Sequence, residues 1–239
     1  MNRILFEHDE IKDDVATFDG VRAEHVLRVL HGEVGQVLKT GELDGPVGTA
    51  EIIAIDAGRV TVRVKHDAEA PAPWVDLVLA PPRPRVMKRL LPQLAAMGVG
   101  RIVLVGAKKV EKDFWGATLL KESVYRPLLV DGLMQAGTTA VPVISVERNF
   151  RKWLTERLDE EFPTRRRVVA HPYGAGAAPA VRAQAQHEGR LLLAIGPEGG
   201  WTDDEVARLE EKGFSRFSLG DRILRTDTAA IALLAVLGT

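Results

Sequence analysis

The stretch LLLAIGPEGGWTDDEV, residues 191–206, decides the fold class. It opens with an apolar run, Leu191–Ile195, of the length and composition of a buried strand. Strands that are apolar throughout are typical of parallel sheets covered on both faces. The run continues into a glycine-rich loop, Gly196–Gly200, and loops at the carboxyl ends of such strands bind ligands in open α/β sheets. The sequence therefore predicts a binding loop here, with a tight turn that binds nothing as the alternative.

The helix that follows this loop has signals at both ends. Thr202 and Glu205 have the spacing of a capping box, and Gly213 is placed to end the helix. The loop lacks the GxGxxG and GxxxxGK[ST] patterns of dinucleotide and P-loop sites. An acidic first helical turn also opposes a bound phosphate. These features disfavour a nucleotide-phosphate enzyme.

Outward from this stretch, apolar runs alternate with helical segments from Trp74 onward. The expected strands are Val75–Ala80, Ile102–Val105, Val141–Val146, Val168–Ala170, Leu191–Ile195 and Ser215–Leu219. The expected helices are Val86–Met97, Thr118–Gln135, Asn149–Leu158, Pro179–His187, Asp203–Lys212 and an apolar last helix, Ala229–Leu237, with Thr226 as its N-cap. Pro92 and Pro127 should kink their helices or delay their start. The alternation predicts an α/β fold with a mostly parallel sheet and helices on both faces.

The first part of the chain has a different pattern. Short strands are expected at Arg3–Phe6, Gly35–Lys39, Thr49–Ile55 and Val60–Val64, with one helix at Val21–Leu30. This combination predicts a small β-barrel. The segment HDAEAPAPW, residues 66–74, has the composition of a linker. We therefore expect two domains, residues 1–68 and 74–239.

Composition excludes several classes of protein. The chain has no cysteine, which excludes a disulfide framework, a thiol nucleophile and thiolate zinc sites. Its N-terminus lacks the apolar region of a signal peptide, and its longest apolar run is shorter than the ~20 residues that cross a bilayer. We expect a cytoplasmic protein that binds neither a membrane nor a metal.

Charge is unevenly distributed along the chain. Residues 1–70 hold 8 Lys/Arg and 14 Asp/Glu, a net charge of −6, whereas residues 81–126 hold 10 and 3, a net charge of +7. A basic stretch in a nearly neutral chain can be a nucleic-acid footprint, and the alternative is a solvated helix face. Arg222 and Arg225 precede the last helix, where a helix N-terminus disfavours cations, so they suit an anionic ligand or ion pairs with Asp221 or Asp227.

The motifs IGPEGG, residues 195–200, and LGDRILRTDTAA, residues 219–230, resemble those of the ribosomal RNA small subunit methyltransferase E family, in the SPOUT class. The resemblance extends to NRILF, EHVLRVLHGE and AAMGV and covers essentially the whole chain. It implies an N-terminal PUA-like β-barrel that assists RNA binding, over residues 1–68. It also implies a SPOUT α/β domain over residues 74–239, in which a trefoil knot, a rare exception among folds, forms the cofactor pocket.

The resemblance further implies a homodimer that methylates N3 of a uridine in 16S rRNA of the small ribosomal subunit, with S-adenosylmethionine as cofactor. Carried onto this sequence, the cofactor-binding residues would be His171, Pro172, Ile195, Gly196, Pro197, Glu198, Gly199, Gly200, Leu219, Gly220, Ile223, Leu224, Arg225, Thr226 and Thr228. The RNA contacts would come from Arg3, Arg22, His25, Arg28, Arg83, Arg85, Lys88 and Arg89.

The chemistry requires that N3 of uridine lose its proton beside a methyl donor. Arg225, and secondly Arg222, are the candidate cations that would stabilise the resulting anion. His171 is the candidate general base, although a histidine before a proline is also often structural. Positioning of two bound substrates could also supply most of the rate without a dedicated base.

Two segments depart from the family pattern. Relatives usually carry a serine-arginine cluster where this chain has GAKKVEK, residues 106–112, and an arginine where it has Thr138. The altered 106–112 segment is the feature that favours an alternative, the same chemistry on a different RNA base. A second alternative is a non-catalytic RNA-binding factor in ribosome assembly, and the intact cofactor motifs argue against it.

Overall fold

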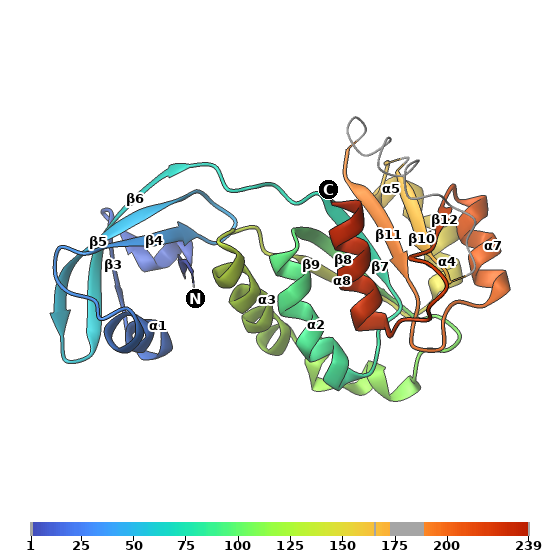
Figure 1. Cartoon of the computed structure of the whole chain (residues 1–239), viewed down its shortest axis with the longest axis horizontal. Coiled ribbons are helices and arrows are strands. Elements are labelled where there is room, and N and C mark those ends of the chain that lie inside the picture. The colour runs from blue at the N-terminus through green and yellow to red at the C-terminus, as the bar shows by residue number, and fades with distance from the viewer. Residues whose placement is uncertain (1, 165, 173–188, 239) are drawn as a thin grey trace. The chain divides into compact units, whose positions relative to one another are not determined.

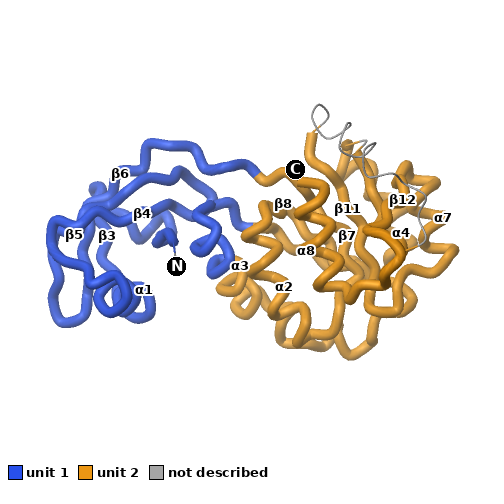
Figure 2. Tube along the Cα trace, in the orientation of Figure 1, with its two compact units in different colours: residues 1–72, 130–141 blue, residues 73–129, 142–239 orange. Residues whose placement is uncertain are grey.

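The computed structural model describes residues 2–164, 166–172 and 189–238 (Figure 1). They divide into two compact units: unit 1 holds residues 1–72 and 130–141, and unit 2 holds residues 73–129 and 142–239 (Figure 2). Unit 1 therefore includes the segment 130–141, which the sequence assigns to the second expected domain. The helix expected at Pro179–His187 lies outside the described residues.

Unit 1 is built on a mixed six-stranded sheet. Its strands are β1 (Ile4–Phe6), β2 (Ile11–Lys12), β3 (Val15–Phe18), β4 (Val37–Glu42), β5 (Val47–Asp56) and β6 (Arg59–Ala68). Their order is β1-β4-β5-β6-β3-β2, with β1 parallel to β4 and the other pairs antiparallel. The sequence misses β2 and β3, and β6 extends through the first residues of the expected linker because it pairs with β5 as far as Ala68.

The helix expected in unit 1 forms as α1 (Gly20–Glu24), which continues into a π-helical turn at His25–Val29. Ala23 and Val26 from this helix join the buried apolar residues of the sheet. Burying alternate residues on one sheet face against an amphipathic helix is the ordinary way to close a small core. The PUA-like barrel stays a prediction.

Unit 2 contains a six-stranded sheet. Its strands are β7 (Val75–Leu79), β8 (Val99–Val105), β9 (Val143–Glu147), β10 (Arg167–Ala170), β11 (Leu191–Ile195) and β12 (Ser215–Phe217). Their order is β12-β10-β11-β7-β8-β9, and every pair is parallel. The predicted α/β fold with a parallel sheet is confirmed.

Helices cover both faces of this sheet (Figure 1). They are α2 (Pro84–Ala96), α4 (Phe150–Glu156), α5 (Leu158–Glu161), α7 (Asp203–Glu211) and α8 (Thr226–Leu237). A further helix, α3 (Glu122–Ala136), begins in unit 2 and ends in unit 1. One face packs against α4, α5 and α7 through a cluster that includes Trp153, Leu158 and Leu209. On the other face α2 packs against α8. Short 3-10 turns form at His8–Glu10, Lys112–Gly116 and Thr118–Leu120.

Several predicted helix bounds are wrong, each for a local reason. The helix expected at Asn149–Leu158 breaks at Arg157, whose φ of −123° is not helical, and the break lets Leu158 enter the core. The helix expected from Thr118 begins at Glu122, because the backbone is extended at Ala117 and Lys121. Both α2 and α3 run through their internal prolines.

Candidate active site

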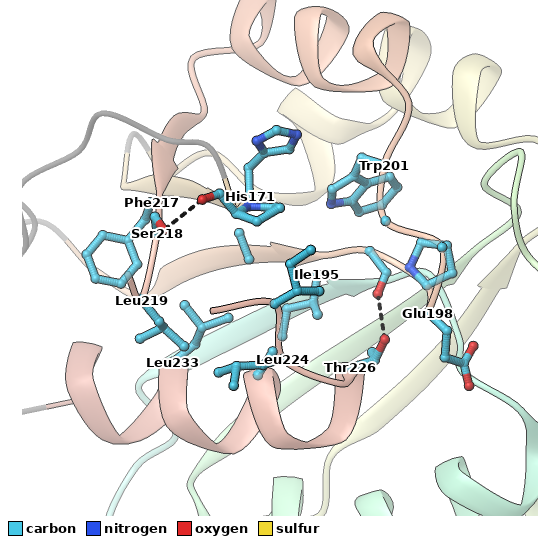
Figure 3. A pocket seen from close by; sticks show the side chains of 18 of the residues that line it. His171, Ile195, Glu198, Trp201, Phe217, Ser218, Leu219, Leu224, Thr226 and Leu233 are labelled. Carbon is cyan, nitrogen blue, oxygen red and sulfur yellow. Dashed lines mark hydrogen bonds between the residues drawn. The ribbon is translucent and has the colours of Figure 1, made fainter. Parts of the chain in front are cut away.

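A cavity of about 480 Å³ lies in unit 2, at the edge of the sheet where β10, β11 and β12 end (Figure 3). Because these strands are parallel neighbours, the loops that follow them meet there. The lining residues come from Ala170–Pro172, from the glycine loop Ile195–Trp201 and from the loop Phe217–Leu224. The start of α8 and the side chain of Lys109 complete the wall.

Residues other than glycine are disfavoured at two positions of the glycine loop, for different reasons. A Cβ atom at Gly196 would lie 3.0 Å from the backbone nitrogen of Trp201, and Gly200 has a φ of +68°. Trp201 is 5% exposed and stacks on Phe150, with 5.3 Å between ring centroids. The loop is therefore held from behind by a buried aromatic pair, while its backbone forms the cavity wall.

The predicted capping box after the loop is confirmed. The Thr202 hydroxyl oxygen accepts from the backbone nitrogen of Glu205 at 3.3 Å, and the Glu205 carboxylate accepts from the backbone nitrogen of Thr202 at 2.8 Å. Gly213, with a φ of +80°, follows the end of α7 as expected. These contacts fix the loop to a helix start and so fix the shape of the cavity wall.

The second loop is held by hydrogen bonds to its neighbours. The Ser218 hydroxyl lies 3.1 Å from the carbonyl oxygens of Pro172 and Gly220 and accepts from the backbone nitrogen of Gly220 at 3.2 Å. The predicted N-cap role of Thr226 is wrong, because Arg225 is the N-cap of α8. Thr226 is instead buried, and its hydroxyl donates to the carbonyl oxygen of Gly196 at 3.3 Å. It therefore joins the two loops across the cavity (Figure 3).

Apolar side chains and backbone groups form much of the cavity wall. Ile195, Leu219, Leu224 and Leu233 lie around it (Figure 3). A flat ring can pack between such side chains while exposed backbone amides and carbonyls bind its polar edge. This arrangement suits a heterocyclic ligand better than a metal or a free phosphate.

Charged groups stand at the cavity wall. Burial, and secondly the cation of Arg216, lower the pKa of His171 below its ordinary 6.5. The imidazole is therefore neutral at neutral pH and can accept a proton. The Lys109 ammonium donates to the carbonyl oxygen of Gly199 at 2.7 Å, and the Glu198 carboxylate accepts from the backbone nitrogen of Arg83 at 3.1 Å.

The structure brings most of the predicted cofactor residues together. Arg225 and Thr228 are exposed and do not line the cavity, whereas the other predicted cofactor residues and Arg222 do. Sequence reasoning did not find the remaining lining residues: Lys109, Ala170, Trp201, Asp203, Phe217, Ser218, Ala229 and Leu233. Trp201 directly follows the glycine loop and Ser218 directly precedes the motif of residues 219–230, so adjacency is the available signal for both.

The predicted RNA-contact residues divide into two groups. Arg3 donates to the carbonyl oxygens of Thr40, Gly48 and Gly137, and Arg22 pairs with Glu10 and lies 5.6 Å from the Phe6 ring centroid. Both guanidinium groups therefore hold unit 1 together.

Most of the other predicted RNA-contact residues are exposed, and His25 is the exception. His25 is half-buried, and its Nε2 atom has no hydrogen-bond partner among the described residues. Arg28, Arg85 and Lys88 are exposed. Arg83 pairs with Glu111 at 2.8 Å and Arg89 with Asp227 at 3.7 Å, and both remain largely exposed.

The part of the chain that the structure describes has neither a cluster of metal ligands nor a helix that could span a membrane. Within residues 2–164, 166–172 and 189–238, no group of three or more His, Cys, Asp or Glu side chains could hold a metal ion. Over the same residues, none of the helices has the length and apolar character needed to cross a membrane.

Comparison with known proteins agrees with this geometry. Residues 68–238 match the family model described as an RNA methyltransferase domain. The ribosomal RNA small subunit methyltransferase E of Treponema pallidum is 32% identical, over 99% of this chain and 90% of the relative. The enzyme of that name from Neisseria gonorrhoeae, solved with S-adenosyl methionine, has a TM-score of 0.77 and 22% identity, covering 99% of this chain and 96% of that one.

A Legionella pneumophila methyltransferase solved with bound SAM has a TM-score of 0.75 and 24% identity, covering 99% of this chain and 96% of that one. At this level of identity the two solved structures establish the fold. The family model and the Treponema relative go further, because they match most of the chain in sequence. The chain therefore belongs to the ribosomal RNA small subunit methyltransferase E family of RNA methyltransferases.

Proposed function

We propose that this protein transfers the methyl group of S-adenosylmethionine to N3 of a uridine in 16S rRNA. The observation that carries the proposal is the cavity of about 480 Å³ between two glycine-containing loops, with apolar side chains and backbone groups around it. Family membership supports methylation of RNA, and two proteins of the same fold bind S-adenosylmethionine in a crystal.

The residues present fit this cofactor. Gly196 presents backbone where a Cβ atom would collide with Trp201, and Gly200 and Gly220 have φ values of +68° and +114°. A loop of this kind lets a flat ring approach the main chain closely. Ile195, Leu219 and Leu224 would pack against adenine, and the cofactor supplies an electrophilic methyl group on sulfur.

The chain's own groups would make N3 nucleophilic. N3 must lose a proton, and the neutral imidazole of His171 at the cavity wall can accept one. A cation near O2 or O4 would stabilise the anion that results. We assign this contact to Arg222, which lines the cavity, with Arg225 as a second cation from the N-cap of α8.

We propose that the substrate is the small ribosomal subunit and that the reaction takes place in the cytoplasm. We also propose that the protein acts as a homodimer. Arg28 in unit 1 and Arg85 and Lys88 on α2 are exposed and suited to phosphate contacts. Ile223 is 75% exposed beside the cavity, so a second copy that covered it would bury apolar surface. The trefoil knot around the cavity belongs to the same proposal.

The test is methyl transfer from labelled S-adenosylmethionine to purified small subunits that lack 3-methyluridine, followed by mass mapping of the rRNA. We expect label on one uridine of 16S rRNA, as N3-methyl. Label on another base would contradict the proposed target. It would favour the alternative suggested by the altered 106–112 segment, the same chemistry on a different RNA base. A protein that binds RNA but not S-adenosylmethionine would instead be a non-catalytic binding factor.

A further inference from the structure

The loop after β8, residues 106–111, reaches the same sheet edge as the glycine loop. β8, β7 and β11 are consecutive parallel neighbours, so their carboxyl ends lie along one edge. A Cβ atom at Gly106 would lie 2.0 Å from the backbone oxygen of Arg148, and the Gly106 backbone nitrogen donates to Glu147 at 2.9 Å. The loop therefore leaves β8 along one fixed path.

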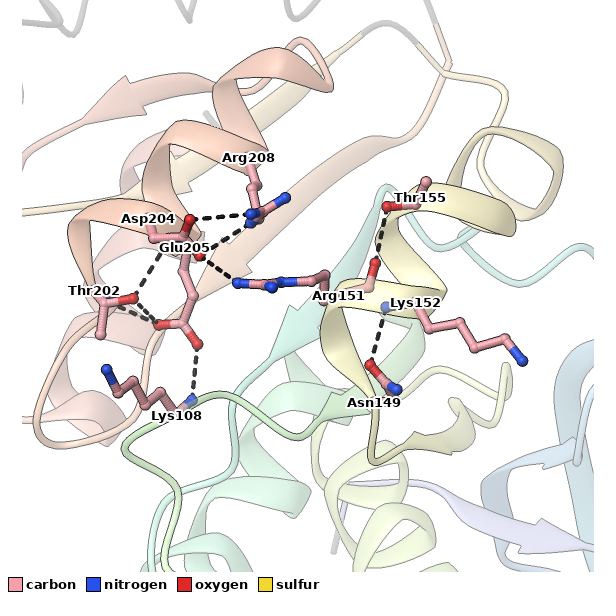
Figure 4. Close-up of polar contacts among 9 residues, drawn as sticks. All are labelled: Lys108, Asn149, Arg151, Lys152, Thr155, Thr202, Asp204, Glu205 and Arg208. Carbon is pink, nitrogen blue, oxygen red and sulfur yellow. Dashed lines mark hydrogen bonds and ion pairs between the residues drawn. The ribbon is translucent and has the colours of Figure 1, made fainter.

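A buried carboxylate ties this loop to the start of α7. One oxygen of Glu205 accepts from the backbone nitrogen of Lys108 at 2.8 Å. The other accepts from the backbone nitrogen and hydroxyl of Thr202 at 2.8 and 2.9 Å. Glu205 is 7% exposed, so these are bonds in a low-dielectric setting (Figure 4). The position of the next residue, Lys109, is set by this attachment.

Lys109 lies over the glycine loop at the cavity mouth. Its ammonium donates to the carbonyl oxygen of Gly199 at 2.7 Å, and its Cδ atom is 2.9 Å from where a Cβ of Gly199 would be. The side chain lines the cavity and yet is exposed. An ammonium has three N–H donors, so two remain for a ligand after the bond to Gly199.

The surroundings favour an anionic ligand outside the cavity rather than within it. Residues 81–126 carry a net charge of +7, and Lys112 beside this loop is also exposed. Two acids of this region are engaged, Glu111 with the Arg83 side chain and Glu198 with the Arg83 backbone nitrogen, while Asp203 also lines the cavity. Lys109 is exposed although it lines the cavity, so its ammonium stands at the rim.

We propose that Lys109 binds a phosphate oxygen of the RNA next to the base that enters the cavity. The inference rests on the proposed function, because it takes the cavity to be where base and cofactor meet. Lysine binds phosphate as a point charge, and such contacts set the register of the nucleic acid rather than read its sequence. The bond to Gly199 would hold the ammonium in place before the RNA arrives, which lowers the entropy lost on binding.

The experiment compares Lys109→Met with Lys108→Met, which removes the same charge from the neighbouring exposed side chain. Binding of small subunits lacking the modification is measured over a range of salt concentrations. We expect Lys109→Met to weaken binding about three- to tenfold. The slope of the logarithm of the binding constant against the logarithm of the salt concentration should become shallower by about 0.7, the value for one contact to single-stranded RNA. Lys108→Met should leave the slope unchanged, and Lys109→Arg should restore it.

Affinity for S-adenosylmethionine is measured on the same variants by titration calorimetry. A large loss of cofactor affinity in Lys109→Met, with an unchanged salt slope, would overturn the inference and place the ammonium on the cofactor. Equal slope changes in both methionine variants would also overturn it, because only general charge would then matter. Wild-type protein that binds RNA with the expected slope but transfers no methyl group would instead overturn the proposed function.

Discussion

Gly196, Gly199 and Gly200 form one loop but are needed for different reasons. At Gly196 a side chain has no room, because the Trp201 backbone is 3.0 Å from the Cβ position. At Gly200 there is room, but the φ of +68° is costly for other residues. At Gly199 the obstacle is the Lys109 side chain, 2.9 Å from the Cβ position. A substitution at Gly199 therefore tests the cavity with the least effect on the backbone.

Gly199→Val should weaken S-adenosylmethionine binding at least tenfold while the protein stays folded. The added side chain displaces Lys109 and narrows the cavity, and a flexible lysine can move without unfolding the loop. Titration calorimetry measures the affinity and circular dichroism the fold. Gly116→Val is the matched control, because a Cβ at Gly116 meets nothing within 4 Å. Unchanged affinity in Gly199→Val would show that the cofactor binds elsewhere.

The pH dependence of methyl transfer should reveal whether His171 accepts the proton. Burial and Arg216 lower the pKa of His171 from 6.5, so the neutral, proton-accepting form is present throughout the range above pH 6.5. The form is lost only as the pH falls through the lowered pKa. We therefore expect the ratio of wild-type to His171→Gln rates to be constant above pH 6.5 and to fall in more acidic buffer. A ratio that stays constant at all pH values would contradict a role as base.

At the scale of elements, the start of α7 serves both stability and the site. Thr202→Ala removes one cap and should lower the free energy of unfolding by about 1 kcal/mol. Glu205→Ala also leaves the Lys108 and Thr202 backbone donors without their acceptor, so we expect a loss of about 2–3 kcal/mol. Urea denaturation measures both losses. Equal losses in the two variants would show that the bonds from the Lys108 and Thr202 backbone nitrogens to Glu205 contribute nothing beyond the cap.

Two neighbouring acids in the first turn of α7 make contacts outside their own helix that a capping pattern does not predict. Asp204 in the first turn of α7 pairs with Arg151 of α4 at 3.0 Å and with Arg208 one turn later (Figure 4). These groups are exposed, so each pair contributes little by itself. Glu205, one residue further on, is buried and makes the bonds that position a loop.

Elements with strong local signals could be predicted from the sequence, and those that depend on partners could not. β11 and α7 follow from an apolar run, a capping box and Gly213, all of which act within a few residues. The short strand β3 has no such pattern and forms because β2 and β6 pair with it. The break at Arg157 likewise depends on burying Leu158 against a sheet that the local sequence does not describe.

The residues of the candidate site likewise fall into those that a local sequence pattern predicts and those that only the tertiary fold brings to the cavity. Gly196–Gly200 could be predicted as part of the site, because glycines directly after a buried strand indicate a tight turn or a close approach of the backbone to a ligand. Lys109 could not, because it reaches the cavity through pairing of β8, β7 and β11 and through a bond across 90 residues of chain. Arg225 had a local signal at a helix start, but its side chain is exposed outside the cavity lining.

At the scale of the whole molecule, the cavity proposed for the cofactor and the tryptophan side chains that fluoresce lie in the same unit. Every described residue that lines the cavity belongs to unit 2. All four tryptophans, Trp74, Trp115, Trp153 and Trp201, also fall within it. Tryptophan fluorescence therefore follows the unfolding of unit 2 alone, whereas far-ultraviolet circular dichroism follows both units.

S-adenosylmethionine should raise the unfolding midpoint that tryptophan fluorescence detects. A ligand that binds only the folded state, at 100 times its dissociation constant, stabilises that state by about 2.7 kcal/mol. Because the cavity lies within unit 2, the free energy of unfolding that fluorescence measures in urea must rise by this amount if the cofactor binds there, and the midpoint rises with it. The Gly199→Val variant should show a smaller increase at the same concentration, at most about 1.4 kcal/mol if its affinity is tenfold or more weaker. A shift seen by circular dichroism but not by fluorescence would place the cofactor in unit 1 and refute the assignment of the cavity.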